Sequence, residues 1–215
     1  MIKILVVDDH DLVRTGFVRM LSDIDGFDVV GEADCGERAV AMARELKPDI
    51  VLMDVKMPGI GGLEATKKLL CAHDRMKVIV VTAVDDNMYP SRLMQAGAFG
   101  YLTKGTDLSE MVTAIKTVYS GKHYMSNSIA QQMALKSYTK EVATPFEKLS
   151  ERELQTALMI ANGKKAQTIA NTFNVSPKTV NSYRYRIFDK LEINSDVELA
   201  LLAVKHGVLD IEINE

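Results

Sequence analysis

The sequence has no tryptophan, only two cysteines and no long apolar run. A transmembrane helix needs about 20 consecutive apolar residues, so we predict no membrane association. Cys35 and Cys71 lie far apart without C-x-x-C spacing, which argues against a disulfide scaffold and a zinc site. We expect both to be buried thiols of a cytoplasmic protein. The apolar run at residues 1–8 is too short for a signal peptide and is expected to form a strand.

The charge is small overall but unevenly distributed. The 215 residues carry a net charge of -3. Residues 1–120 hold 14 Lys/Arg and 18 Asp/Glu, a net of -4, whereas residues 164–190 hold six Lys/Arg and one Asp, a net of +5. A basic stretch within an acidic protein is a candidate surface for binding a polyanion.

The length suits two small domains, and the first half alternates aliphatic runs with amphipathic segments. The predicted strands are residues 4–7, 27–31, 50–53, 78–82 and 100–103. The predicted helices are residues 12–22, 35–46, 62–73, 89–96 and 108–120. This alternation indicates a doubly wound parallel α/β sheet, with the flavodoxin-like strand order 2-1-3-4-5.

After Gly121 the pattern becomes helical only. We expect a helix over residues 126–140, a linker over 137–145, and an all-α domain whose first helix opens with a Ser150-x-x-Glu153 capping box. The other expected helices are 165–174, 177–191 and 195–205. The predicted division is therefore residues 1–121, a partly helical linker 122–145, and residues 146–215, with a helix-turn-helix at about 165–190.

Reactive side chains follow the predicted strands of the first domain. They are Asp8, Asp9, Asp54, Thr82 and Lys104. Parallel strands gather such residues at one edge of the sheet, where clustered carboxylates repel each other and favour a hard cation such as Mg2+. Each aspartate could instead cap the next helix, which is our interpretation of Asp11 and Asp85. The convergent set favours a phosphate-accepting aspartate, with His10 outside an oxygen-preferring metal site.

The predicted helix 177–191 combines basic and polar residues with a core stripe. Val180, Ile187 and Leu191 recur at helical spacing and should face the core. The contact candidates are Lys178, Asn181, Tyr183, Arg184, Arg186 and Lys190. This could be an ordinary solvated face, but the scarcity of acids, the Ser176-Pro177 start and the interleaved tyrosine favour DNA binding.

Four segments of the first half resemble bacterial response-regulator receiver domains. They are Val-Val-Asp8-Asp9-His10, Leu-Met-Asp54-Val-Lys-Met-Pro58-Gly59, Val-Thr82-Ala and Gly-Tyr101-Leu-Thr-Lys104. The resemblance implies that Asp54 receives phosphate from a sensor histidine kinase. It also implies that Asp8, Asp9, Asp54 and the Lys56 carbonyl hold Mg2+, and that Lys104 pairs with the phosphoryl group.

The resemblance further implies a switch at two residues. Thr82 would move its hydroxyl toward the phosphate, and Tyr101 would turn inward behind it. The sequence departs from the family after Lys104, where Gly105 replaces a common proline. Glycine does not favour the unusual peptide geometry that a proline supports in this loop, whereas the chemistry of Lys104 is unaffected.

The second half resembles the LuxR/FixJ-type output domain. The matching segments are Leu149-Ser150-Glu151-Arg152-Glu153, Ile169-Ala170, Val175-Ser176-Pro177-Lys178-Thr179-Val180 and Leu191. The resemblance implies DNA binding by Lys178, Thr179, Asn181, Ser182, Tyr183, Arg184, Arg186 and Lys190. It also implies dimerisation through the final helix, with Leu199, Leu201 and Leu202 on its surface.

The combined pattern is similar to the GacA/UvrY-type global regulators of the NarL/FixJ class. That resemblance implies a cytoplasmic, non-enzymatic response regulator that binds double-stranded DNA as a homodimer and mainly activates transcription, including that of small regulatory RNA genes. Two alternatives stay open: a helical tail that binds RNA or protein, and an aspartate-nucleophile phosphatase. The adjacent Asp8-Asp9 pair lacks the D-x-D spacing of such phosphatases.

Overall fold

The computed structural model describes residues 1–215 except 58, 74, 83–89, 140–143, 207 and 210–215. It forms two compact units, Met1–Thr139 and Lys140–Glu215, each described by itself below. Residues 122–139 of the predicted linker thus belong to the first unit, and the other predicted domain boundaries stay predictions. Among the described helices, none combines the length and the apolar character required to cross a bilayer.

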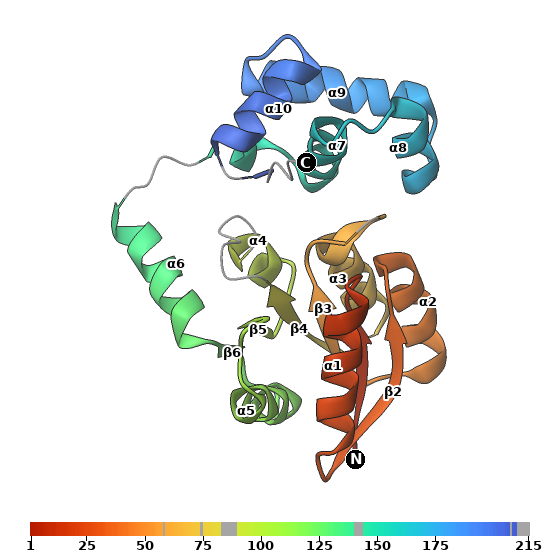
Figure 1. Ribbon diagram of the computed structural model, residues 1–215, viewed down its shortest axis with the longest axis vertical. Helices are drawn as coiled ribbons and strands as arrows, with labels where there is room; N and C mark the ends of the chain where they lie inside the picture. The colour runs from red at the N-terminus through yellow and green to blue at the C-terminus, as the bar shows by residue number, and fades with distance from the viewer. Residues whose placement is uncertain (58, 74, 83–89, 140–143, 207, 210–215) are drawn as a thin grey trace. The chain divides into compact units, whose positions relative to one another are not determined.

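The first unit is built on a parallel sheet (Figure 1). Its strands are β1 (Ile2–Val7), β2 (Phe27–Ala33), β3 (Ile50–Asp54), β4 (Lys77–Thr82), β5 (Gly100–Thr103) and β6 (Tyr124–Met125). The order β2-β1-β3-β4-β5-β6 confirms the predicted arrangement of the first five strands. The sixth strand is an addition that the sequence did not predict, because two residues are too few to show a strand periodicity.

Helices cover both faces of this sheet (Figure 1). They are α1 (Asp11–Ser22), α2 (Gly36–Leu46), α3 (Gly61–Ala72), α4 (Pro90–Gln95) and α5 (Leu108–Tyr119). The helix α6 (Asn127–Thr139) follows β6 at the edge of the sheet and extends away from it. The start of the predicted helix 89–96 falls on Tyr89, which lies outside the described residues. Gly97, with φ 98°, ends α4 in the left-handed conformation that glycine tolerates.

The two faces of the sheet have separate cores. One contains Phe17 and Leu21 of α1 and Met111 and Ile115 of α5, packed on Ile4 and its neighbours. On the other face α2, α3 and α4 lie next to one another. Every residue of β3 is buried, as are Ile79, Val80 and Val81 in β4, as expected for central strands of a parallel sheet with helices on both faces.

The second unit is helical. It comprises a 3-10 turn (Pro145–Lys148), α7 (Glu151–Ala161), α8 (Ala166–Phe173), α9 (Pro177–Leu191) and α10 (Asp196–Lys205). The predicted capping box opens α7: Glu153 N–H donates to Ser150 Oγ, and Ser150 N–H donates to Glu153 Oε2. Ser176 likewise caps α9, with Pro177 in its first turn.

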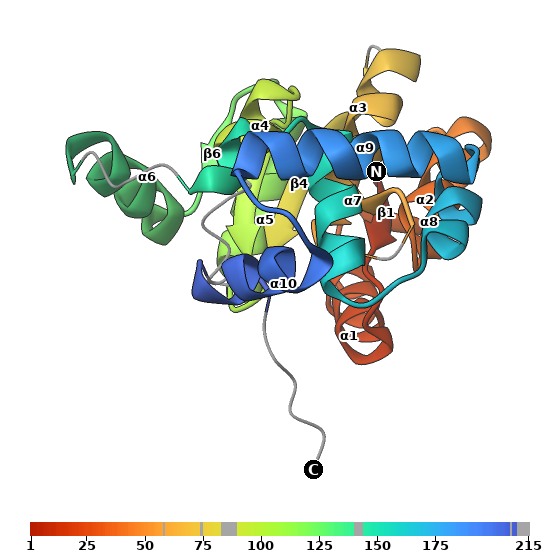
Figure 2. The ribbon, with the colours of Figure 1, turned by 90° about the horizontal axis from the view of Figure 1, so that it is seen from above.

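The helices α8 and α9 form the predicted helix-turn-helix. The turn between them begins at Asn174, which ends α8 in the left-handed conformation with φ 53°. In Figure 2, α9 is the long helix of this unit and α7 crosses beneath it. The core stripe Val180, Ile187 and Leu191 is buried, as predicted.

The predicted burial of the two thiols is wrong. Cys35 is only half-buried where it precedes α2, and Cys71 is exposed near the end of α3. Both are free cysteines. The prediction rested on the average behaviour of cysteine, which does not report the face of the helix on which a given residue lies.

Candidate functional site

The predicted residues of the first unit converge at the carboxyl edge of its sheet. Asp54 ends β3 and Thr82 ends β4, while Asp8 and Lys104 directly follow β1 and β5. Lys104 Nζ lies 2.8 Å from Asp8 Oδ2 and 2.9 Å from Asp54 Oδ2. A single lysine therefore bridges two carboxylates that are almost fully buried.

The backbone around Asp54 is held by a close approach of α3. Val55 N–H donates to Asp54 Oδ1 at 2.7 Å, and Gly62 N–H donates to Val55 O at 3.0 Å. A Cβ atom added to Gly62 would lie 2.0 Å from the carbonyl oxygen of Asp54. Only glycine allows α3 to begin this close to the strand that carries the carboxylate.

The loop after β1 is ordered by a basic residue that the sequence analysis missed. Arg14 Nη1 donates to Asp8 O at 2.7 Å, and the same side chain pairs with Asp11 and lies 3.6 Å from Glu32. Its position one turn into α1 carries no pattern that would distinguish it from a solvated arginine. The predicted capping role of Asp11 is wrong, because His10 is the N-cap of α1 and Asp11, its first residue, pairs with Arg14 instead.

Burial dominates the electrostatics of Asp54. Desolvation raises the pKa of its carboxyl from 3.8 to about 6, and the hydrogen bond and charge of Lys104 only partly oppose this effect. For Lys104, burial would lower the pKa of the ammonium group, but hydrogen bonds to Asp8 and Asp54 raise it above its ordinary value. At neutral pH the site therefore holds a charged lysine between two poorly solvated carboxylates.

The acidic residues are close enough to share a cation. One ligand atom from each of Asp8, Asp9, His10 and Asp54 lies within 4.8 Å of the others. The three carboxylates match the oxygen ligands that a hard divalent ion prefers, and one lysine does not balance their charge. His10 Nδ1 lies 3.1 Å from Asp8 Oδ1 and 2.9 Å from Asp9 Oδ1. Its ring thus already has carboxylate partners.

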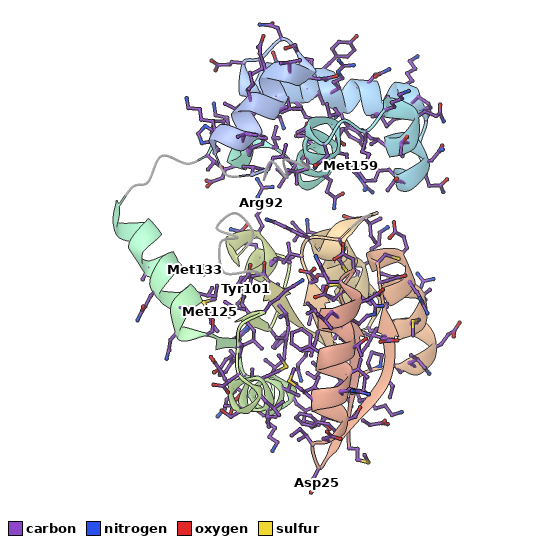
Figure 3. All side chains as sticks on the ribbon, viewed as in Figure 1. Asp25, Arg92, Tyr101, Met125, Met133 and Met159 are labelled. Carbon is purple, nitrogen blue, oxygen red and sulfur yellow. The ribbon has the colours of Figure 1, made fainter. Side chains whose placement is uncertain are left out.

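The two predicted switch residues lie beside this cluster. Thr82 and Tyr101 are 1% and 0% exposed, so Tyr101 already occupies the inward position expected for its ring; Figure 3 labels it on β5. Lys104 N–H donates to Thr82 O at 2.7 Å, which ties the ends of β4 and β5 together. The peptide bond between Lys104 and Gly105 is trans.

The exposed face of α9 contains part of the predicted DNA-contact set. Lys178, Asn181, Ser182 and Arg186 are exposed and recur at helical spacing. Tyr185 shares their face and is 73% exposed, because it lies opposite the core stripe of the same helix.

The other predicted contacts are partly buried. They are Thr179, Tyr183, Arg184 and Lys190. Thr179 Oγ1 lies 2.9 Å from Ser176 Oγ at the helix start. Lys190 Nζ lies 2.6 Å from Glu153 Oε2, and Arg184 Nη2 lies 2.7 Å from Asp196 Oδ2. Both cations thus have an acidic partner on a neighbouring helix, and their contact with DNA stays a prediction.

The three leucines of the predicted dimerisation stripe on α10 differ in exposure, and their role in dimerisation stays a prediction. Leu199 is fully buried, with 0% exposure, because it faces the core of the second unit. Leu202 is half-buried. The exposed apolar residues are Val197 at 68% and Leu201 at 65%, which lie four positions apart on one face of the helix.

Comparison with known families assigns both units. Residues 4–116 match the response regulator receiver domain, and residues 147–203 match the bacterial regulatory proteins of the luxR family. Together these matches confirm the two resemblances that the sequence motifs indicated.

Individual proteins resemble the chain over nearly its whole length. The response regulator GacA of Pseudomonas aeruginosa is 64% identical over 211 residues, which cover 98% of this chain and 99% of the relative. The response regulator UvrY of Escherichia coli K12 is 54% identical over 213 residues, covering 99% and 98%. A structure of RcsB from Salmonella enterica serovar Typhimurium bound to promoter rprA is 21% identical, covers 95% of this chain and 99% of that chain, and has a TM-score of 0.69.

Proposed function

This chain belongs to the two-component response regulators that join a receiver domain to a LuxR-type DNA-binding domain, and from that membership we propose that Asp54 is its phosphoacceptor. A sensor histidine kinase donates the phosphoryl group. The observation that carries the proposal is the burial of the Asp54 carboxylate 2.9 Å from Lys104 Nζ, in one group of carboxylates with Asp8 and Asp9.

The transfer follows from the positions of the donors. Val55 N–H orients Asp54 Oδ1, which leaves Oδ2 on the side of Lys104 to attack the phosphorus atom. The new O–P bond forms as the N–P bond to the kinase imidazole breaks, and the imidazole retains the electron pair. Lys104 then pairs with a phosphoryl oxygen and balances the added negative charge.

Asp8, Asp9, Asp54 and the backbone carbonyl of Lys56 would hold Mg2+ at this site. When bound, the ion neutralises part of the charge that gathers on the phosphoryl oxygens. The close grouping of carboxylate oxygens supports this assignment. The residues themselves supply the attacking oxygen, the lysine partner and the enclosing backbone.

The signal leaves the site through Thr82 and Tyr101. The Thr82 hydroxyl moves toward the phosphoryl group, and this movement fixes Tyr101 in its inward position. The backbone of Tyr101 is bonded to the edge strand, since Ser126 N–H donates to Tyr101 O at 3.0 Å. A shift of β5 would therefore displace Ser126, the residue just before α6.

The output is control of transcription through the exposed face of α9. Lys178 and Arg186 neutralise phosphates, while Asn181, Ser182 and Tyr185 face the bases of the major groove. Two copies bind as a homodimer through α10, with Leu201 and Leu202 at its surface. The high identity to GacA and UvrY supports a cytoplasmic regulator that mainly activates its targets, small regulatory RNA genes among them.

Phosphate transfer to Asp54 can be tested by replacing that residue with its amide. In the presence of Mg2+ and a phosphorylated sensor kinase, the native chain should take up an acyl-phosphate label, and Asp54→Asn should take up none. Asp25→Asn is the matched control, because Asp25 is exposed in the loop before β2, far from this edge of the sheet (Figure 3). It should label as the native chain does.

The same samples test the output. Labelled native chain should bind a promoter duplex more tightly than unlabelled chain, while Asp54→Asn should bind alike with and without kinase. Normal labelling of Asp54→Asn would contradict the acceptor assignment. Preference for competitor RNA over duplex DNA would instead favour an RNA-binding tail.

A further inference from the structure

The recognition helix α9 is held by ion pairs on two sides. On one side Lys190 pairs with Glu153 of α7, and on the other Arg184 pairs with Asp196, the first residue of α10. In the described part of the second unit, α10 packs mainly on α7, whereas its contact with α9 is sparse. The Arg184–Asp196 pair thus joins two helices directly, whereas most of their packing is against α7.

Arg184 occupies a position on α9 that suits a connection and does not suit base contact. It lies four residues after Val180 and three before Ile187, so it belongs to the stripe that faces the protein interior. Its guanidinium carbon lies 5.4 Å from the ring centroid of Phe188, which limits the rotamers that the side chain can adopt. Ser182 lies on the other side of the helix, whereas Asn181, three residues before Arg184, lies between the interior stripe and the exposed face.

The ion pair is partly shielded from solvent. The side chains of Arg184 and Asp196 are 39% and 44% exposed, but Arg184 Nε and Asp196 Oδ1 are both buried without a hydrogen-bond partner. Separating the two residues would leave these atoms buried and would also break the ion pair. The geometry therefore favours a single arrangement of α9 against α10.

The orientation of α9 against α10 affects DNA binding when two copies bind together, which rests on the proposed function. In a dimer joined through α10, the separation of the two α9 helices depends on how each α9 is oriented relative to its own α10. A dimeric helix-turn-helix protein reads two half-sites about one helical turn apart, so a small change of this angle alters which spacing fits.

We propose that the Arg184–Asp196 ion pair is a specificity-determining element that fixes the angle of α9 to α10 and thereby sets the half-site spacing that the dimer accepts. Arg184 acts through the helix that it orients and does not touch a base. Asp196 is its positioning partner. The pair therefore contributes to the choice among DNA sites and leaves the contact of one α9 with one half-site unchanged.

The test compares spacing preference with half-site affinity. Duplexes selected from a random pool by the full native chain with beryllofluoride provide the reference site. From it a single half-site and versions lengthened or shortened by one or two base pairs are made. The variants are Asp196→Asn and Arg184→Met, which break the pair, and Asp196→Glu, which keeps the charge. Glu192→Gln is the control, because it removes one exposed negative charge without touching the pair.

Partly exposed ion pairs make small contributions, so the expected loss of preference is about threefold to fivefold. Asp196→Asn and Arg184→Met should narrow the affinity ratio between the reference spacing and its neighbours by that factor, with half-site affinity unchanged. Asp196→Glu and Glu192→Gln should retain the native ratio. Thermal unfolding of each variant checks that α9 and α10 remain folded.

Three results would overturn the proposal. The first is a native spacing preference in both pair-breaking variants. The second is an equal loss of half-site affinity and of spaced-site affinity, which would make the pair a general support of the fold. The third is a rise of half-site affinity with steeper salt dependence in Asp196→Asn, which would make Arg184 a DNA-binding cation restrained by Asp196. If the native chain binds no duplex, the proposed function itself fails.

Discussion

Each unit of the molecule contains a buried carboxylate paired with a lysine, and the two pairs behave oppositely. Asp54 Oδ2 lies 2.9 Å from Lys104 Nζ, and the pKa of Asp54 is raised to about 6. Glu153 Oε2 lies 2.6 Å from Lys190 Nζ, yet the pKa of Glu153 is lowered. A short lysine–carboxylate distance therefore does not decide whether the charged form is stabilised.

The difference comes from the remaining neighbours. Burial raises the pKa of both carboxyl groups, but Asp54 also faces the charge of Asp8, which raises it further. At Glu153, the hydrogen bonds from Lys190 and from Ser150 outweigh the burial. The charge of Asp8 thus makes the ionised form of Asp54 unfavourable despite its pairing with Lys104, as expected for a site that takes up a cation or phosphate. The second pair is satisfied by the protein alone and anchors α7 to α9.

The largest expected loss of stability comes from replacing the glycine that packs against the backbone of Asp54. Gly62→Ala should destabilise the first unit by about 3 kcal/mol, because its Cβ would meet the Asp54 carbonyl at 2.0 Å and force α3 away from β3. Gly163→Ala is the matched substitution in the second unit. Open space surrounds Gly163, so only the strain of φ 73° remains, costing about 1 kcal/mol.

Hydrogen exchange measured separately for the two units, together with phosphoryl labelling, checks this prediction. Labelling of Gly62→Ala should fall with its stability, whereas Gly163→Ala should label normally. Equal losses of stability in the two variants would show that the close approach at Asp54 has no special cost.

Neutralising each carboxylate should change stability in opposite directions. Without Mg2+ at neutral pH, Asp54→Asn should stabilise the first unit by about 1 kcal/mol, because it removes a charge with a raised pKa, although it also loses the attraction of Lys104. Glu153→Gln should destabilise the second unit by about 2 kcal/mol, since it breaks a favourable buried pair. Denaturant unfolding followed by hydrogen exchange in each unit measures both. The same sign in both variants would remove the distinction between the pairs.

The second pair also predicts a response to acid. The pKa of Glu153 is lowered below its ordinary value of 4.5, so its stabilisation is complete above that value and is lost as the pH falls through the folded-state pKa. Between about pH 5 and about pH 3, the native second unit should lose more stability than Glu153→Gln does. Thermal unfolding across that range compares the two, with the first unit of each sample as internal reference. Parallel curves would mean that Glu153 is not stabilised in the folded state.

The residues of the first site could be identified from the sequence because of their positions relative to the predicted strands. Asp8, Asp54 and Lys104 all follow recognisable strands, and the geometry of a parallel sheet brings strand ends together. Strand β6 could not be predicted, since it forms only because Tyr124 N–H donates to Phe99 O and Ser126 N–H, just after the strand, donates to Tyr101 O. Such pairing depends on the tertiary fold.

In the second unit, the candidate DNA contacts were chosen by residue type, although helical spacing already indicates which face of α9 a residue occupies. Arg184 and Lys190 are basic residues on a basic helix, which suggested phosphate contact. The spacing of Arg184 from Val180 and Ile187 already places it on the interior stripe. Lys190 depends on Glu153, which is 37 positions away and could not be identified as its partner without the fold.

A further prediction separates the solvated cations of α9 from the paired ones. Arg186→Ala should weaken duplex binding by about tenfold at moderate salt and make the dependence of log affinity on log salt shallower by about one, because one phosphate contact is lost. Lys190→Ala removes the same charge from the same helix, but this lysine already neutralises Glu153. Its salt dependence should therefore stay native while the stability of the second unit falls. Equal changes of salt slope in both variants would return Lys190 to the DNA-contact set.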